Sequence, residues 1–113
     1  MVKEKEFLLC TTDVPDGYRL KRVLGMAWGS EVKSRGASAN IVALFRSFKG
    51  GNIPELQNMA MEARRVSIDR MIQAAKKMGA NGVVGVNLTA LTFKSDIVEF
   101  IAYGTAVVVE KKG

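Results

Sequence analysis

The segment from Ile97 to Glu110 carries apolar side chains on both faces of the β-strand that its composition predicts. Successive residues of a strand point to opposite faces of a sheet, so each face takes every second residue. One face receives Val98, Phe100, Ala102, Gly104, Ala106 and Val108. The other receives Ile97, Ile101, Tyr103, Val107 and Val109, interrupted by Glu99 and Thr105. A small sheet with helices on one face leaves the other face in water, so we expect a second copy of the chain to cover it.

The length and composition are those of one globular domain. The chain has 113 residues, of which 48% are hydrophobic and 25% are charged, and only two are prolines. That is enough apolar surface for one hydrophobic core and too little for two, so we expect a single domain over residues 1–113. Cys10 is the only cysteine, and neither a signal peptide nor an apolar run of about 20 residues is evident. We therefore expect a cytoplasmic protein without a membrane segment.

The periodicity of the rest of the chain predicts an α+β fold. We expect a small antiparallel sheet and two helices, in the order β-β-α-α-β-β along the chain. The strands are expected over residues 6–13, 18–33, 82–93 and 97–110, a short helix between residues 38 and 50, and a long helix over residues 54–78. At about 100° per residue, the long helix has a broad apolar stripe. The stripe includes Leu56, Ala60, Ala63, Ser67, Met71, Ala74 and Met78.

Three glycines at regular spacing, Gly79, Gly82 and Gly85, suggest a loop that binds phosphate. Phosphate-binding loops of that kind precede a helix, because the amino-terminal amides of the helix face the phosphate. Here the glycines follow the long helix, so we expect Gly79 to terminate it and Gly82 to reverse the chain. Gly85 lies within a strand, where a missing side chain predicts a β-bulge or a close approach by another backbone, such as that of the next subunit in a ring.

The net charge of +6 is concentrated in the helical middle of the chain. Residues 37–80 carry seven basic and three acidic side chains, a difference of +4. No run of four or more basic residues occurs, so the pattern favours a solvated basic surface over a nucleic-acid interface. Weak nucleic-acid binding through the basic helical face is the alternative.

Several stretches spread over nearly the whole chain resemble a known family. They are "TTD" at 11–13, "PDGY" at 15–18, "GG" at 50–51, "EARRVSIDRM" at 62–71, "MGANGVVGV" at 78–86 and "EFIAYGTAVVVE" at 99–110. They resemble the YbjQ-like family of small bacterial and archaeal proteins. The resemblance implies a dodecin-like α+β subunit assembled in a ring, a homopentamer, with a "putative heavy-metal-binding" label and no established reaction. The family pattern has an arginine after the third-strand valine, where this chain has Asn87 after Val86, so the resemblance does not carry over an anion site there.

The sequence offers few groups for metal binding or catalysis. There is no histidine, Cys10 is the lone thiol, and Met59 and Met61 lie roughly 200° apart around a helix, so one chain does not chelate a soft metal ion. A cluster of Cys10 thiols from several subunits is the one alternative to a buried, inert cysteine. Without histidine, Ser-His-Asp and Cys-His arrangements are excluded, so we do not expect an enzyme.

Six residues are candidates for ligand binding. Arg64 falls inside the apolar arc of the long helix, where an unpaired charge is strongly disfavoured. Its partner is therefore an acidic side chain, carbonyl groups of a neighbouring subunit or an anionic ligand. The other candidates are Arg70 at the edge of that arc and the strand hydroxyls of Thr11, Thr12, Tyr103 and Thr105.

The sequence therefore predicts a ring-forming binding or structural module that holds a small anionic ligand between subunits near Arg64. Heavy-metal binding at a symmetric Cys10 cluster and weak nucleic-acid binding are the alternatives. Trp28, flanked by Gly25 and Gly29, is better explained by packing at a subunit interface than by stacking on a planar ligand. No motif identifies a cofactor or the ligand itself.

Overall fold

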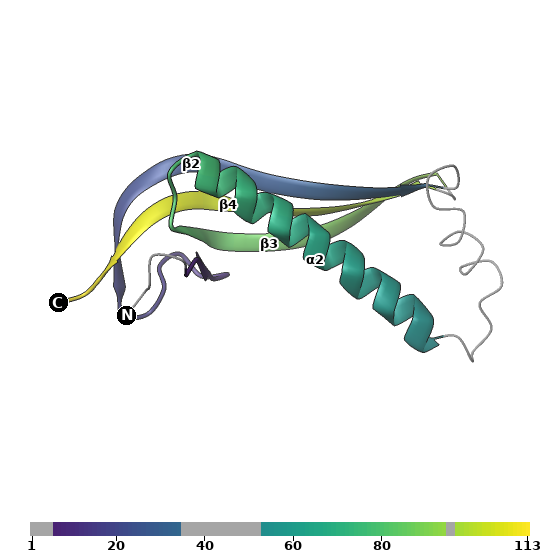
Figure 1. Cartoon of the computed structure of the whole chain (residues 1–113), viewed down its shortest axis with the longest axis horizontal. Coiled ribbons are helices and arrows are strands. Elements are labelled where there is room, and N and C mark those ends of the chain that lie inside the picture. Colours follow the sequence, from purple (N-terminus) through teal and green to yellow (C-terminus); the bar gives the residue numbers. More distant parts are fainter. Residues whose placement is uncertain (1–5, 35–52, 95–96) are drawn as a thin grey trace.

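The computed structural model describes residues 6–34, 53–94 and 97–113. These residues form a four-stranded sheet in the order β1-β3-β4-β2, with one long helix across one face (Figure 1). Strands β2 and β3 each pair antiparallel with β4, and β1 pairs parallel with β3. The elements are β1 (Leu8–Leu9), β2 (Tyr18–Ser34), α2 (Ile53–Lys77), β3 (Gly82–Lys94) and β4 (Ile97–Lys111).

The long elements match the sequence prediction to within two residues at each end, whereas the first strand and the sheet type do not. The strand predicted over residues 6–13 is regular only at Leu8–Leu9, and because it runs parallel to β3 the sheet is mixed rather than antiparallel. Beyond Leu9 the chain no longer forms a regular ladder. Its backbone carbonyls accept hydrogen bonds from Gly85 and Val86 of β3 instead. The short helix predicted between residues 38 and 50 lies outside the described residues.

Helix α2 packs on the sheet through side chains spaced four residues apart. Ala63, Ser67, Met71 and Ala75 are at most 1% exposed, and all four lie on the broad apolar stripe that the sequence predicts. They face small residues and one valine of the sheet, namely Ala27, Val83, Ala102 and Ala106. The first part of α2 extends beyond the sheet (Figure 1). Met61, in the first half of the helix, is exposed. Within the described part of the chain, no helix has the length and apolar character needed to cross a membrane.

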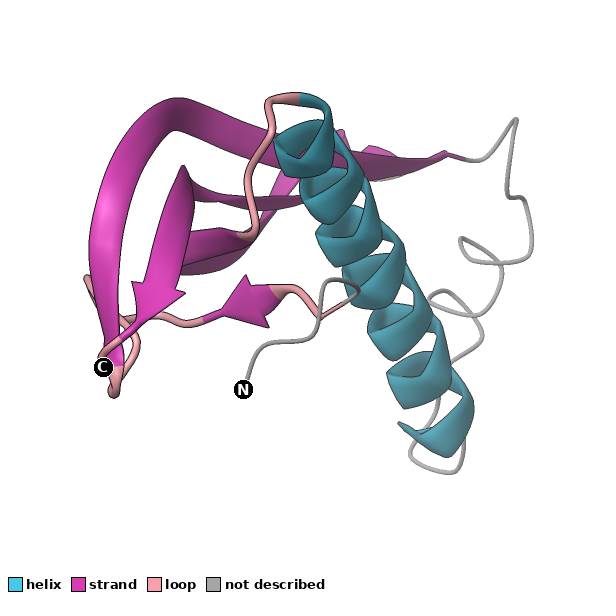
Figure 2. Cartoon of the chain, turned by 60° about the vertical axis from the view of Figure 1, so that its left-hand side comes forward, coloured by secondary structure: helices cyan, strands magenta, loops and turns pink. Residues whose placement is uncertain are grey.

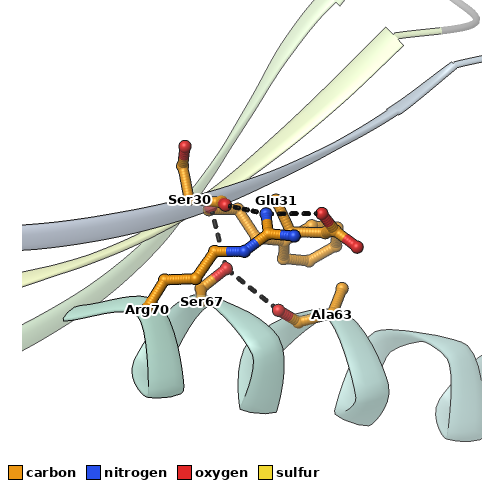
Figure 3. A network of polar contacts seen from close by, with 6 residues as sticks. Ser30, Glu31, Ala63, Ser67 and Arg70 are labelled. Atoms are coloured by element: carbon orange, nitrogen blue, oxygen red, sulfur yellow. Dashed lines mark hydrogen bonds and ion pairs between the residues drawn. The ribbon is translucent and has the colours of Figure 1, made fainter. Parts of the chain in front are cut away.

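Helix α2 approaches the backbone of the sheet closely at Gly29 of β2. A β-carbon on Gly29 would lie 2.5 Å from the carbonyl oxygen of Ser67 and would also overlap the backbone nitrogen of Met71. Next to this contact, the Ser67 hydroxyl lies 2.9 Å from the carbonyl oxygen of Ala63 and 3.0 Å from that of Phe100 in β4 (Figure 3). The helix therefore rests directly on the β2 backbone and is bonded to the neighbouring strand.

A second, smaller core lies on the far face, which is the face of the sheet turned away from α2. It is formed by Val84, Val107 and Val109, and it is covered by residues of the amino-terminal part of the chain, namely Leu8, Cys10 and Tyr18. At the same end of the sheet β2 bends strongly (Figure 2), where register shifts interrupt its pairing with β4 between Leu20 and Arg22 and between Val23 and Gly25. Part of the face expected to be covered by a second copy is thus covered by the chain itself.

The bulge predicted at Gly85 is confirmed. Gly85 has a φ of 61°, and the pairing of β3 with β4 shifts register between Val84 and Asn87. The backbone that approaches it belongs to the same chain, because the Gly85 amide donates to the carbonyl of Thr12 at 2.9 Å and the Val86 amide donates to that of Cys10 at 3.0 Å. We call residues 8–12 the amino-terminal strap. Gly79, with a φ of 93°, follows the end of α2 as predicted.

Replacing Gly29 by alanine should lower the free energy of unfolding by roughly 1–3 kcal/mol, because the added methyl group overpacks a contact between two backbones. Gly113→Ala is the matched control, since a β-carbon there meets no atom within 4 Å. Urea denaturation of both variants measures the difference. Equal midpoints for Gly29→Ala and the unmodified chain would contradict this packing.

Candidate functional site

The far face carries rows of side chains that lie opposite one another on neighbouring strands. Residues paired across a ladder point to the same face and are in reach of each other. Four rows cross β2, β4 and β3 in that order, and they are Met26-Thr105-Val84, Trp28-Tyr103-Asn87, Ser30-Ile101-Thr89 and Val32-Glu99-Leu91. The residues between them in β2 and β4, such as Ala27 and Ala102, are buried under α2. The two faces of this part of the sheet therefore differ, one covered by the helix and the other open.

A contiguous apolar patch occupies these rows. Met26 is 65% exposed and Trp28 is 58% exposed, and together with Ile101 and Tyr103 they line a shallow, open hollow of about 300 Å³. The patch continues toward the ends of β2 and β3 through two exposed residues, Val32 and Leu91. We define the apolar patch as Met26, Trp28, Val32, Leu91, Ile101 and Tyr103. Contiguous apolar surface of this kind marks an interaction site more often than a single exposed residue does.

The six ligand candidates from the sequence lie on different sides of the molecule. Tyr103 and Thr105 belong to the far face, whereas Arg64 and Arg70 belong to α2, across the sheet. Thr11 and Thr12 are exposed and follow β1. The Thr12 hydroxyl donates to the carbonyl of Val14 at 3.3 Å. One chain therefore does not bring these six side chains into a single pocket.

Arg70 ties α2 to the end of β2. Its Nη1 donates to the carbonyl oxygen of Ser30 at 2.6 Å and to Glu31 Oε1 at 2.8 Å (Figure 3). The Glu31 side chain is only 17% exposed, so the pair is partly shielded from water. The Arg70 charge already has a carboxylate partner within the chain, and its geometry is that of a structural link between helix and sheet.

Arg64 differs from Arg70 in having no such partner. Its side chain is half-buried, and it makes no hydrogen bond or ion pair with any described residue. The neighbouring Arg65, by contrast, is exposed and pairs with Glu62 at 2.9 Å. A partly buried arginine without a counter-charge among the described residues is a position on α2 where an external anionic group would be stabilising.

The residues of one chain do not fit a heavy-metal site. No three side chains of the types His, Cys, Asp and Glu come together among the residues that the structure describes, and the chain has no histidine at all. The Cys10 side chain packs against the small core of Val84, Val107 and Val109, and its thiol donates to the carbonyl of Thr12 at 3.3 Å. Soft metal ions are held by several thiolate or imidazole ligands, and Cys10 is a single, half-buried thiol turned toward its own core.

Sequence reasoning found parts of the apolar patch but not its extent. It assigned Trp28 to an interface, and it identified β4 as apolar on both faces. It did not place Met26 or Leu91 with Tyr103, because the neighbours of a residue across a sheet depend on register. The sequence signal for the patch is the alternation of residues in β2, which places Met26, Trp28 and Val32 on one face. All three are exposed in the structure.

Comparison with known proteins connects these features to one family. The sequence model of the YbjQ family, described as "Putative heavy-metal-binding", matches residues 7–110. A UPF0145 protein of Sulfurisphaera tokodaii is 43% identical over 109 residues, which cover 96% of each chain. A UPF0145 protein of Bradyrhizobium sp. is 40% identical over 107 residues, covering 95% of this chain and 96% of the relative.

A solved structure has a similar fold. It is a Pediococcus pentosaceus protein with unknown function of the DUF74 family, with a TM-score of 0.61 and 11% sequence identity, and the match covers 92% of this chain and 98% of that one. At that identity the likeness concerns the α+β fold alone.

Titration of the purified chain with Cd²⁺ or Zn²⁺ should give less than one tightly bound ion per chain, because no set of soft ligands converges among its described residues. Cys10→Ser should leave that result unchanged. Equilibrium dialysis followed by elemental analysis measures both. Stoichiometric binding that Cys10→Ser abolishes would contradict the expectation and would restore a Cys10 metal site.

Proposed function

This chain belongs to the YbjQ family, and we propose that it acts as a self-assembling binding or structural module whose copies cover one another's apolar patch. The observation that carries the proposal is the patch itself, in which Met26 and Trp28 are each more than half exposed in the isolated chain. Burying a large apolar side chain completely contributes about 1.5–3 kcal/mol, so covering several of them favours association strongly. The family resemblance suggests the form of the assembly, a closed ring that we take to be a homopentamer.

Self-association also explains why the chain covers only one end of the far face. The end near the bend of β2 has its own cover, since Leu8 and Cys10 lie over the small valine core. The end with Trp28 and Tyr103 has no cover among the described residues, although its residues are of the same apolar kind. A neighbouring copy that covers this second end would complete a sheet buried on both faces, as the composition of β4 requires.

A Trp28→Glu substitution should shift the chain from an oligomer toward a monomer of 12.3 kDa, because it places a charge in the middle of the buried interface. The control is Met61→Glu, which changes an exposed methionine on α2 and should leave the oligomer intact. Light scattering coupled to size-exclusion chromatography at micromolar concentration measures the mass. A mass of 12.3 kDa for the unmodified chain would overturn the proposed function.

A small anion held near Arg64 is the second part of the proposed function. Its support is Arg64 itself, a half-buried arginine without a partner among the described residues, whereas Arg65 and Arg70 are both paired. In an assembly, further burial of Arg64 would raise the cost of leaving it without a counter-charge. We therefore propose that Arg64 contributes to an anion site between copies, with a compact oxyanion such as phosphate as the simplest ligand of that chemistry.

The alternative functions have less support. For metal binding, the part of the chain that the structure describes brings together no group of three His, Cys, Asp or Glu side chains. Nucleic-acid binding would need a continuous basic surface, and two of the basic side chains of α2, Arg65 and Arg70, are already paired with acidic residues.

Arg64→Gln should weaken phosphate binding at least about tenfold, because a charge-assisted contact to an oxyanion contributes about 1.5–3 kcal/mol. Arg65→Gln is the matched control, since it removes an exposed arginine one residue away and should leave the affinity unchanged. Isothermal titration calorimetry with inorganic phosphate measures the affinities. Equal affinities for the two variants, or no binding to the unmodified chain, would contradict an anion site at Arg64.

A further inference from the structure

On the premise of the self-assembly proposed above, we infer that the copies join edge to edge. In this arrangement the outer edge of β2 in one copy pairs with the outer edge of β3 in the next, so that the sheet continues from copy to copy. The partner of each edge is therefore a second copy of this chain, and the two edges that meet are different ones. The inference rests on the pairing pattern of the sheet and on the distribution of exposed residues along its two borders.

The first open edge is the second half of β2. Strand β2 pairs with β4 from Tyr18 to Ser34, and no described residue pairs with its other side. The first half of β2 has features that prevent an edge from pairing with another strand, since it carries basic side chains and two register shifts. From Met26 to Ser34 the pairing is regular and there is no proline. The stretch has two charged residues, Glu31, which is bonded to Arg70 on the helix-covered side, and Lys33 near its end. From Met26 to Ser30 it carries no charge, and a regular edge of this kind is a template for another strand.

The second open edge is the later part of β3. Strand β1 pairs with β3 only at Gly82 and Val83, and the amino-terminal strap bonds to β3 no further than Val86. From Asn87 to Thr92 every residue is exposed, including Leu88 and Leu91, and the segment contains neither a charge nor a proline. No described residue pairs with the outer side of this segment. As far as the described residues go, the sheet thus has an unpaired edge on each of its two borders.

The two open edges match each other in position and direction. They flank the same part of β4, because Trp28 and Asn87 both lie opposite Tyr103, and Ser34 and Lys94 both lie opposite Ile97. Strands β2 and β3 run in the same direction, since each is antiparallel to β4. A rotation about an axis roughly along the strands would therefore pair β2 with the β3 of the next copy in a parallel ladder. A contact between two different edges is heterologous, and repeated by rotation it closes into a ring.

Edge pairing also extends the apolar patch from copy to copy. Val32 and Leu91 point to the far face from the two opposite borders of the sheet. When the sheet continues into the next copy, the Val32 of one chain comes to lie near the Leu91 of the other on that same face. The exposed apolar residues at the borders then become interior residues of a wider sheet. The same contact satisfies the free backbone groups of both edges and joins the patches of neighbouring copies. For the copies also to cover one another's patch, the ring closes with the far faces inward and the helices outward.

Disulfide trapping tests this geometry. In a Cys10→Ser background, Ser30→Cys marks the β2 border, and Thr89→Cys and Leu91→Cys, two residues apart on the same face, mark the β3 border and allow for the register. Each pair of chains is co-expressed with different tags and oxidised. Within one chain Ser30 and Thr89 are separated by β4, about 10 Å from Cα to Cα, which is too far for a disulfide. Only contact between copies can therefore link these positions.

We expect a disulfide between Ser30→Cys and one of the two β3 variants, and none when Ser30→Cys is expressed alone. Asn58→Cys, on the exposed surface of α2, is the control and should remain unlinked to Ser30→Cys. A Ser30→Cys homodimer would overturn the inference in favour of like edges meeting. An oligomeric mass without any cross-linked product would overturn it as well while leaving the proposed self-assembly intact. A monomeric mass would overturn both.

Discussion

The contact of α2 with the backbone at Gly29 is the constraint on which the rest of the structure depends. Because Gly29 has no side chain, the helix lies directly on β2, and the ties from Ser67 and Arg70 to the neighbouring backbone hold it there. The core beneath it is correspondingly thin and consists largely of alanine, with Met71 as its largest fully buried residue. A single helix held this way covers one face of the sheet only. The apolar residues on the other face are left to a different cover.

The chain itself covers only one end of that other face. At the bent end of the sheet, the amino-terminal strap lies over Val107 and Val109 and bonds to the bulge at Gly85. At the other end the far face is open, and so are both borders of the sheet among the described residues. Exposed apolar surface and unprotected edges are each unfavourable for an isolated chain, and they coincide in the same half of the sheet. Association edge to edge pairs both borders, and closure of the ring with the far faces turned inward covers the patch, which is why we place self-assembly ahead of any catalytic or metal-binding role.

Much of the fold followed from the sequence because its long elements repeat a simple pattern many times. The four-residue spacing of Ala63, Ser67 and Met71 and the two apolar faces of β4 are local properties of one segment. The parallel pairing of β1, the cover over the valine core and the meeting of Arg70 with Glu31 are not local. They depend on the register between segments that are far apart in the chain. Each β-bulge shifts that register by one residue. For the same reason the candidates Arg64 and Tyr103 could be proposed together although they lie across the sheet from each other.

The chain contains a single tryptophan, and it lies in the middle of the apolar patch, so its fluorescence tests the central claim most directly. In the isolated chain the Trp28 side chain is 58% exposed and would be quenched readily by acrylamide. If copies cover the patch, Trp28 should show blue-shifted emission and resist quenching at micromolar concentration, and both properties should be lost in denaturant. Emission and quenching like those of a tryptophan in water, from the folded chain at that concentration, would contradict the account.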